Sequence, residues 1–206
     1  MHKTRNQISN LWSVPRKGTR FMTVSSHNQE KAIPVLVVLR DILKLGKTKK
    51  EIKRIILLEK IKINGKLIKD EKFPLSLFDI LGIGEKDYKI TIKNKRFSLE
   101  ETKSHEKISK VIGKKILPGN KVQINLNDGR NFISKEKINV GDSIMFNVKE
   151  NKISKIIPLK EGSEIIVISG SHIGETGKIE KINENTAEVK IGKEKINLEI
   201  DSLIAI

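Results

Sequence analysis

The chain has 206 residues, a formal net charge of +16 and no cysteine. The absence of thiols excludes disulfides and thiolate zinc sites, and the four histidines have no metal-ligand spacing, so we expect no metal and no other cofactor. The longest apolar run, residues 33–39, is far shorter than the ~20 residues of a membrane span, and the N-terminus has no signal-peptide core. We therefore expect a cytoplasmic protein that does not enter a membrane.

The positive charge is concentrated in the first three quarters of the chain. Residues 1–60 hold 14 Lys and Arg against 4 Asp and Glu, and residues 61–160 hold 22 against 12. Residues 161–206 reverse the balance, with 5 against 9. A basic field of this size attracts polyanions and releases their counterions on binding, which favours a nucleic-acid partner. The alternative is a lysine-rich surface that only keeps the protein soluble.

Residues 1–33 show neither helical nor strand periodicity. Their basic side chains are interspersed with Trp12, Phe21 and Met22. A segment of this kind buries little apolar surface alone, so we expect a basic arm that belongs to no core and becomes ordered on a partner. Trp12 is either an anchor that packs the arm, the interpretation we favour, or a stacking platform for a base.

A first helix is predicted over residues 34–45. Pro34 suits its first position and Gly46 its end. Its apolar face contains Leu36, Leu39, Ile42 and Leu43.

A second helix is predicted over residues 49–58. Thr48 and Glu51 have the spacing of a capping box, in which each side chain bonds to the other's backbone amide. Helical spacing places Ile52, Ile55, Ile56 and Leu58 on an apolar side. The opposite side carries the cations Lys49, Lys50, Lys53 and Arg54. This face either contacts RNA phosphates or is simply solvated, and we favour RNA contact because of its density of cations.

The pattern then changes to strands. Ile61 and Ile63 precede the turn Asn64-Gly65, which predicts a β-ribbon. Residues 71–84 are expected to form a loop or a short helix, and residues 88–93 a strand. From residue 96 to 160 short alternating stretches, with turns at 127–129 and 140–142, predict a small barrel or sandwich.

Residues 161–206 predict a second β unit. Strands are expected at 164–168, 178–182, 186–191 and 195–200, with a hairpin at Gly192-Lys193 and a loop containing Gly170, Gly174 and Gly177. The glycines do not fit a nucleotide loop, since a P-loop needs Ser or Thr where Ile179 stands. They are either plain turn glycines or part of a binding loop. His172 in this loop either donates to a phosphate or has no role.

No catalytic constellation is visible. There is no Ser/His/Asp arrangement with a nucleophile elbow, and acid pairs such as Glu100-Glu101 lie in polar stretches. We therefore expect neither an enzyme nor a small-molecule substrate.

Three stretches resemble known families. Residues 47–66, ending in Ile63-Asn64-Gly65-Lys66, resemble the RNA-binding motif named after small-subunit ribosomal protein four, in which the second helix and this turn face RNA. Residues 161–179, with the three loop glycines, resemble the KOW motif, which forms an SH3-like barrel whose loop contacts RNA or protein. Together with the start His2-Lys3-x-Arg5 and the stretch 32–40, their order resembles the e-type family of small-subunit ribosomal protein four. The absence of the C-terminal tail of eukaryotic members favours an archaeal-type protein.

The resemblance implies an α+β multidomain fold. Its expected parts are a basic arm (1–33), a helix–helix–β-ribbon RNA-binding domain (34–95), a central β-barrel-like domain (96–160) and a C-terminal SH3-like KOW barrel (161–206).

It also implies a structural constituent of the small ribosomal subunit that acts in subunit assembly and translation. The expected partners are small-subunit ribosomal RNA and neighbouring ribosomal proteins. Two alternatives stay open, namely a free KOW-containing RNA-binding regulator and the targeting part of an RNA-modifying enzyme. The candidate RNA-binding residues are His2, Lys3, Arg5, Arg16, Lys17, Arg20, Arg40, Lys49, Lys50, Lys53, Arg54, Lys60, Lys62, Asn64, Lys66, Ser169, Ser171, His172 and Thr176.

Overall fold

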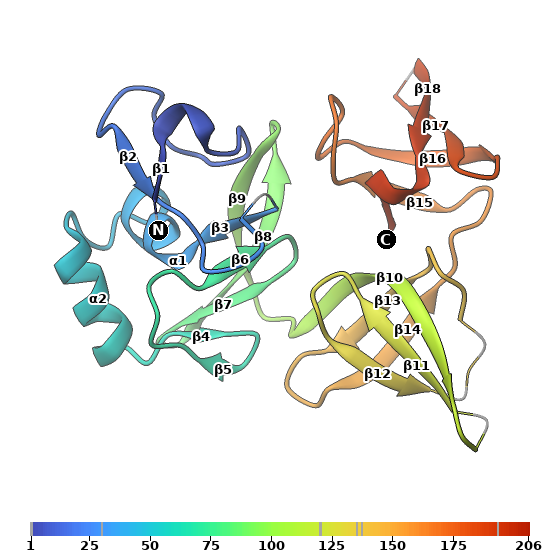
Figure 1. Ribbon diagram of the computed structural model, residues 1–206, viewed down its shortest axis with the longest axis horizontal. Helices are drawn as coiled ribbons and strands as arrows, with labels where there is room; N and C mark the ends of the chain where they lie inside the picture. The colour runs from blue at the N-terminus through green and yellow to red at the C-terminus, as the bar shows by residue number, and fades with distance from the viewer. Residues whose placement is uncertain (1, 30, 120, 135, 137, 193) are drawn as a thin grey trace. The chain divides into compact units, whose positions relative to one another are not determined.

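The protein is mostly β with few helices. Its computed structural model describes residues 2–29, 31–119, 121–134, 136, 138–192 and 194–206. The chain divides into two compact units, Met1–His105 and Glu106–Ile206 (Figure 1). We call them the N-terminal unit and the C-terminal unit.

The main sheet of the N-terminal unit has five antiparallel strands in the order β5-β4-β7-β8-β9. These strands are β4 (Lys62–Ile63), β5 (Lys66–Leu67), β7 (Ile80–Ile83), β8 (Lys86–Lys93) and β9 (Arg96–Thr102). Alternation along β8 buries Ile90 and Ile92, and Ile92 lies opposite the buried Phe97 of β9. Residues 96–102 thus complete the N-terminal sheet, although their pattern alone places them at the start of the central domain.

Two short ribbons accompany this sheet. They are β1 (His2–Thr4) with β2 (Phe21–Thr23) and β3 (Ala32–Pro34) with β6 (Pro74–Ser76), and the short 3₁₀ helix η1 (Arg5–Gln7) follows β1. The expected loop or short helix at 71–84 is wrong, since β6 and β7 lie there. Asp79 holds the intervening turn by accepting bonds from the Ser76 amide and the Asn64 side chain, both at 2.7 Å. These contacts bring together segments far apart in sequence, which a local pattern does not reveal.

The first helix is shorter than expected. A single turn of α-helix, α1 (Val35–Val37), continues as the π-helix η2 (Val38–Ile42). Pro34 precedes the helix as its cap, and the chain leaves it through Lys44 at φ 55°, before Gly46. All five residues from Val35 to Leu39 are buried, so this helix is enclosed by the unit and does not present only one apolar face. The second helix, α2 (Lys49–Leu58), has the predicted bounds.

The N-terminal segment is part of the N-terminal unit's core. Trp12 is 3 % exposed and its indole nitrogen donates to the Ala32 carbonyl at 3.3 Å. The backbone amide of Phe97 donates to the Leu11 carbonyl at 2.7 Å, which ties the segment to β9. The expectation that residues 1–33 belong to no core is therefore wrong, whereas Trp12 packs as favoured. Its buried residues are scattered over two short strands and irregular backbone, so they produce no period in the sequence.

The first sheet of the C-terminal unit has the order β12-β11-β10-β13-β14. Its strands are β10 (Glu106–Leu117), β11 (Lys121–Leu126), β12 (Asn131–Ser134), β13 (Ser143–Asn147) and β14 (Lys152–Ile157). The long strand β10 pairs with β13 in its first half and with β11 in its second, with a register shift between Val111 and Gly113. Turns at 127–129 and 140–142 join the strands as predicted.

The second sheet has the order β18-β17-β16-β15-β19. Its strands are β15 (Glu164–Val167), β16 (Thr176–Ile182), β17 (Thr186–Ile191), β18 (Glu194–Glu199) and β19 (Leu203–Ala205), and the 3₁₀ helix η3 (Ile200–Ser202) precedes β19. Its core contains Ile165, Val167, Ile179, Ala187, Val189, Leu203 and Ala205. Gly192 opens the expected hairpin, and Lys193 lies outside the described residues.

The two sheets of the C-terminal unit are bonded to each other. The ammonium of Lys110 in β10 donates to the Ile200 carbonyl at 2.6 Å, and the Ala205 amide donates to Ser143 Oγ at 3.0 Å. The Asp142 carboxylate accepts bonds from the Asn139 and Leu159 amides. Because these groups are buried or half-buried, the bonds fix how the second sheet joins the first.

Candidate nucleic-acid interface

The start of α2 is built by the predicted capping box. Thr48 Oγ1 accepts from the Glu51 amide at 3.3 Å, and Glu51 Oε2 accepts from the amides of Thr48 and Lys47 at 3.4 and 2.8 Å. These bonds, that from Lys47 most of all, lower the pKa of Glu51. Ile52 and Ile56 are fully buried and orient the helix. The cap and the two isoleucines therefore determine which side of α2 faces outward.

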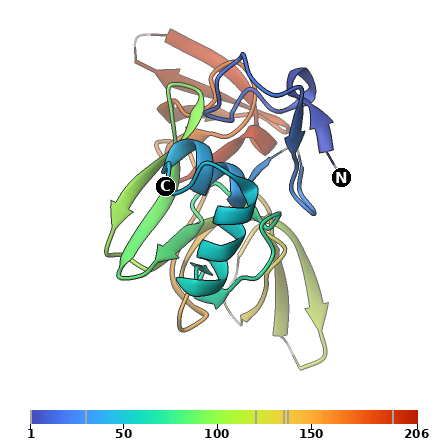
Figure 2. The ribbon, with the colours of Figure 1, turned by 90° about the vertical axis from the view of Figure 1, so that its left-hand side faces the viewer.

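The outward side of α2 is cationic. Lys50, Lys53 and Arg54 are exposed, and α2 lies unobstructed at the surface of its unit (Figure 2). Lys49 differs from them, because its ammonium lies 3.0 Å from the buried carboxylate of Glu71. Burial alone raises the pKa of Glu71, but the bond to Lys49 and the nearby charge of Lys53 leave it below its ordinary value. Three cations of the predicted face are thus available to a ligand, and Lys49 is partly neutralised.

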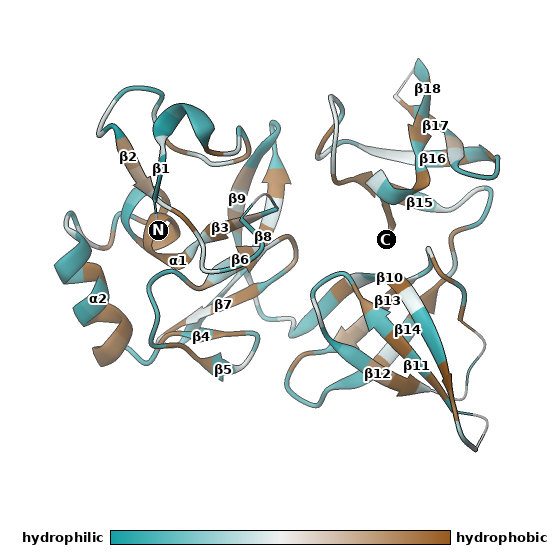
Figure 3. Cartoon of the chain, viewed as in Figure 1, coloured by the Kyte–Doolittle hydropathy of each residue, from teal (hydrophilic) through white to brown (hydrophobic). Residues whose placement is uncertain are grey.

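The C-terminal turn of α2 departs from the prediction. Leu57 and Leu58 are 57 % and 70 % exposed, although Leu58 has the spacing of the apolar side. This turn is the hydrophobic end of an otherwise hydrophilic outer face (Figure 3). The buried side of α2 is therefore narrower than predicted and rests on Ile52 and Ile56.

The β-ribbon after α2 forms as predicted, with positive φ at both Asn64 and Gly65. The Asn64 amide, however, is used inside the protein: its nitrogen donates to Asp79 at 2.7 Å and its oxygen accepts from the Ile80 amide at 3.0 Å. Asn64 therefore holds the turn. Lys60, Lys62 and Lys66 are exposed, and Lys62 and Lys66 point to opposite faces of the ribbon because they are not cross-strand partners.

Arg40 is engaged by its neighbour. Its Nε and Nη2 donate to the two carboxylate oxygens of Asp41, both at 2.9 Å. This bidentate bond raises the pKa of Arg40. Arg40 therefore lies in a local ion pair within η2. Because its charge is paired with Asp41, it does not add to the exposed cations of α2.

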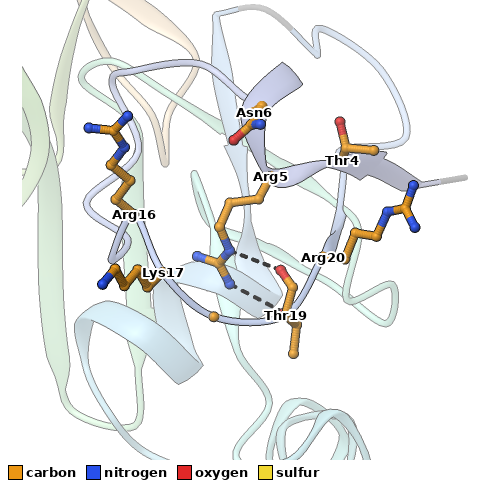
Figure 4. A pocket seen from close by; sticks show the side chains of 8 residues that line it. Thr4, Arg5, Asn6, Arg16, Lys17, Thr19 and Arg20 are labelled. Carbon is orange, nitrogen blue, oxygen red and sulfur yellow. Dashed lines mark hydrogen bonds between the residues drawn. The ribbon is translucent and has the colours of Figure 1, made fainter.

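The basic residues of the N-terminal segment fall into two groups. Arg5 points inward, donating to the Thr19 carbonyl at 2.9 Å, Thr19 Oγ1 at 3.3 Å and the Pro15 carbonyl at 2.5 Å. Arg16, Lys17 and Arg20 are exposed around a hollow at this loop (Figure 4).

The remaining two candidates of this segment lie on β1. His2 packs edge-on against Phe21, with ring centroids 4.8 Å apart, and Lys3 is half-buried. Arg20 directly precedes β2, and its guanidinium lies over the Phe21 ring, 5.4 Å from the ring centroid.

The glycine loop joins β15 to β16. Gly170 and Gly174 lie in the loop with positive φ, but Gly177 lies within β16, where a Cβ would come 2.6 Å from the Lys190 carbonyl oxygen. Gly177 is therefore required for close strand packing and not for the loop. Ser169, Ser171 and Thr176 are exposed, whereas His172 Nδ1 lies 3.0 Å from a carboxylate oxygen of Glu175.

Further exposed cations, which are not among the predicted RNA-binding residues, lie on the β10–β11 hairpin. Lys114, Lys115 and Lys121 are exposed there, and their position on both sides of the turn signal Pro118-Gly119 was available in the sequence. Conversely, Lys107 and Lys110 are 2 % and 4 % exposed, and the Lys107 ammonium lies 2.6 Å from Asp128. Some of the positive charge of the chain is thus structural and does not reach a ligand.

Within the ranges that the structure describes, no three His, Cys, Asp or Glu side chains gather in a way that holds a metal ion. Likewise, none of the helices in those ranges has the length and apolar character needed to cross a membrane.

Comparisons with known proteins agree with this arrangement. Residues 85–153 match the model of the ribosomal family S4e, residues 34–81 that of the S4 domain and residues 161–191 that of the KOW motif. The chain is 35 % identical to the small ribosomal subunit protein eS4 of Archaeoglobus fulgidus, over 87 % of this chain and 79 % of that protein. The protein of the same name from Methanosphaera stadtmanae is 33 % identical over 88 % and 79 %.

A solved structure is also similar. The crystal structure of the 30S ribosomal protein S4e from Thermoplasma acidophilum superposes with a TM-score of 0.74 at 30 % identity, covering 86 % of this chain and 95 % of that one. With relatives of this identity matched over most of their length, the chain belongs to the S4e family of small-subunit ribosomal proteins.

Proposed function

We propose that this chain binds ribosomal RNA mainly through exposed cations of its N-terminal unit. The observation that carries the proposal is the face of α2, where Lys50, Lys53 and Arg54 lie together on a helix whose orientation is set by a cap and two buried isoleucines. Cations presented on a rigid element contact phosphates at a small entropic cost. Lys60, Lys62 and Lys66 of the following turn and ribbon are also exposed, and because Lys62 and Lys66 lie on opposite faces of the ribbon, only one of these two extends this surface.

As a member of the S4e family, the protein is a structural constituent of the small ribosomal subunit and not an enzyme. It acts in the cytoplasm, in subunit assembly and translation, and the two relatives named above are archaeal. Its partners are small-subunit ribosomal RNA and, we propose, neighbouring ribosomal proteins.

Each part of the chain has its own role in this function. We propose that the segment 1–33 and the helix–helix–ribbon domain 34–95 form one RNA-binding unit. The support is that the Leu11–Phe97 bond and the pairing of β3 with β6 attach the segment to the unit that carries α2. The part of the central β region that belongs to the C-terminal unit, residues 106–160, then serves as a spacer with its own exposed lysines on β10 and β11, and residues 161–206 serve as an SH3-like KOW module.

The KOW module makes the least electrostatic contact. Residues 161–206 carry 5 Lys and Arg against 9 Asp and Glu, so a broad phosphate-tracking surface there would repel RNA. If the module touches RNA, it does so through the hydroxyl groups of Ser169 and Ser171 in the glycine loop and of Thr176 at the start of β16. Its acidic strands β17 and β18 then meet a basic neighbouring protein or solvent. RNA laid along these strands in the assembled particle, with the glycine loop free, would contradict this assignment.

Sedimentation of cell lysate through a low-salt gradient tests the proposal. A small-subunit constituent migrates with the small subunit, and it binds purified small-subunit RNA with a steep salt dependence. Migration near the top of the gradient would instead favour a free KOW-containing regulator or the targeting part of an RNA-modifying enzyme. A variant with Gln at Lys50, Lys53 and Arg54 is compared with the wild type in the same RNA-binding assay, because it alters only the surface that carries the proposal.

A further inference from the structure

The loop of residues 15–20 is shaped around the side chain of Arg5, which is half-buried. The Arg5 guanidinium donates three hydrogen bonds into this loop, two to Thr19 and one to the Pro15 carbonyl. The Arg5 amide also donates to the Arg20 carbonyl at 2.8 Å, where the β1–β2 ribbon begins. One side chain therefore fixes both ends of the loop.

Arg5 holds the loop without losing its charge. Its three acceptors are two carbonyls and a hydroxyl, which are neutral, and residues 1–29 contain five Lys and Arg and no Asp or Glu. An arginine paired with a carboxylate, as Arg40 is with Asp41, contributes little to the field around it. Arg5, in contrast, adds a full positive charge to the floor of the loop.

Three more cations surround this charge. Arg16, Lys17 and Arg20 line the same hollow, which has a volume of about 520 Å³ and also borders the polar side chains of Thr4, Asn6 and Thr19. Figure 4 shows Arg5 at its centre, with Arg16 and Lys17 to one side and Arg20 to the other. Four like charges gathered at one hollow repel one another, and an anion among them relieves this repulsion. The hollow is thus suited to a compact anion.

Gly18 makes the arrangement possible. It has φ +147°, and a Cβ at this position would lie 2.6 Å from Arg5 Nη2. The guanidinium cannot easily retreat, because its bonds to Thr19 and Pro15 hold it in place. A side chain at residue 18 would therefore displace Arg5 and the loop together.

We propose that this hollow is a binding site for a phosphodiester group of RNA. Arg16, Lys17 and Arg20 contact the phosphate, since guanidinium groups match its oxygens and lysine adds a point charge. Arg5 is a positioning residue that shapes the loop and adds to the field. The proposal rests on the RNA-binding function proposed above and adds to it a defined site on the N-terminal segment, separate from the α2 face.

The substitution Gly18→Ala tests the site without changing any charge. We expect it to weaken RNA binding about tenfold and to flatten the salt slope by about 1, since the contact to one phosphate is lost. Gly84→Ala is the matched control, because Gly84 also has positive φ, +59°, but has open space around it. It should bind RNA as the wild type does. Wild-type affinity and slope in Gly18→Ala would overturn the proposal.

Arg5→Lys tests the positioning role, and it also serves if Gly18→Ala fails to fold. Lysine keeps the charge but has no fork to bond Thr19 and Pro15 together, so we expect a loss close to that of Gly18→Ala. Wild-type binding by Arg5→Lys, combined with a loss in Arg5→Gln, would show that Arg5 acts through charge alone and would overturn the positioning role. Single Gln substitutions at Arg16, Lys17 and Arg20 should each lower the slope by less than about 1, since the three cations share one phosphate.

Titration of the full chain with inorganic phosphate separates this site from the proposed function. We expect backbone amide signals of residues 16–20 to shift in NMR spectra of the wild type and not of Gly18→Ala. Shifts in this loop without any RNA binding by the wild type would refute the ribosomal function and leave the anion site standing. RNA binding by the wild type, with no shift at the loop and no loss in Gly18→Ala, would refute the site alone.

Discussion

Removing the free cations of α2 should change the salt dependence of RNA binding by a predictable amount. The variant carries Gln at Lys50, Lys53 and Arg54, which are exposed, and keeps Lys49, which is bonded to Glu71. Each phosphate neutralised contributes about 0.7 to the log–log salt slope on single strands and about 0.9 on duplex. Losing three contacts flattens the slope by about 2–3. Between 50 and 200 mM salt the wild type should then lose about 20- to 40-fold more affinity than the variant.

Filter binding or fluorescence anisotropy over a salt series measures these slopes. Small-subunit RNA and an unrelated RNA should weaken by similar factors, because phosphate contacts carry little sequence information. Lys49→Gln is the matched control, and its effect on the slope should be smaller than that of each of its three neighbours. A triple variant with the wild-type slope would refute the assignment of α2 to RNA, and a loss confined to small-subunit RNA would show that this face reads bases.

Three further predictions concern the support of this surface. Trp12→Ala should destabilise the N-terminal unit by about 3–5 kcal/mol, because it leaves a cavity where Trp12 is buried. Urea unfolding followed by circular dichroism measures this loss. Phe21→Ala is the control and should cost less than about 1 kcal/mol, because the Phe21 side chain is 52 % exposed. A Trp12→Ala loss below that of Phe21→Ala would show that the segment does not support the core. Thr48→Ala should cost about 1 kcal/mol in the same assay through its lost cap, and an unchanged midpoint would count against the capping box. The pKa of Glu71 is lowered from its usual 4.5, so its ion pair stabilises the protein fully above that pH and progressively less as the pH falls through the folded pKa. Glu71→Gln should remove this part of the acid dependence of stability. An acid unfolding transition identical to that of the wild type would contradict the prediction.

Local patterns in the sequence determined much of the candidate surface. The Thr48–Glu51 spacing and the repeat of isoleucines specified α2 and its exposed face, and Asn64-Gly65 specified the ribbon. Strand alternation specified most strands of the C-terminal unit. These features depend on side chains interacting with backbone a few residues away, so the information lies within a short window.

Tertiary structure decided which of the candidate groups are available. Asn64 and Arg5 have the residue types of RNA contacts, but Asp79 and the loop carbonyls engage them inside the protein. Lys107 adds to the net charge, yet its ammonium is buried against Asp128. Their partners lie from ten to more than twenty residues away, and no local period records such a distance.

The N-terminal segment also depends on long-range contacts that no local sequence pattern records. Its sequence is basic and without a period, yet Trp12 is buried and Phe97 bonds to its backbone. Composition determines that such a segment buries little surface alone. Only the folded unit supplies the apolar cavity and the strand edge that receive it, because both are assembled from residues distant in the chain. The charge of this protein was therefore readable from its sequence, whereas the positions at which that charge meets a ligand are set by long-range packing.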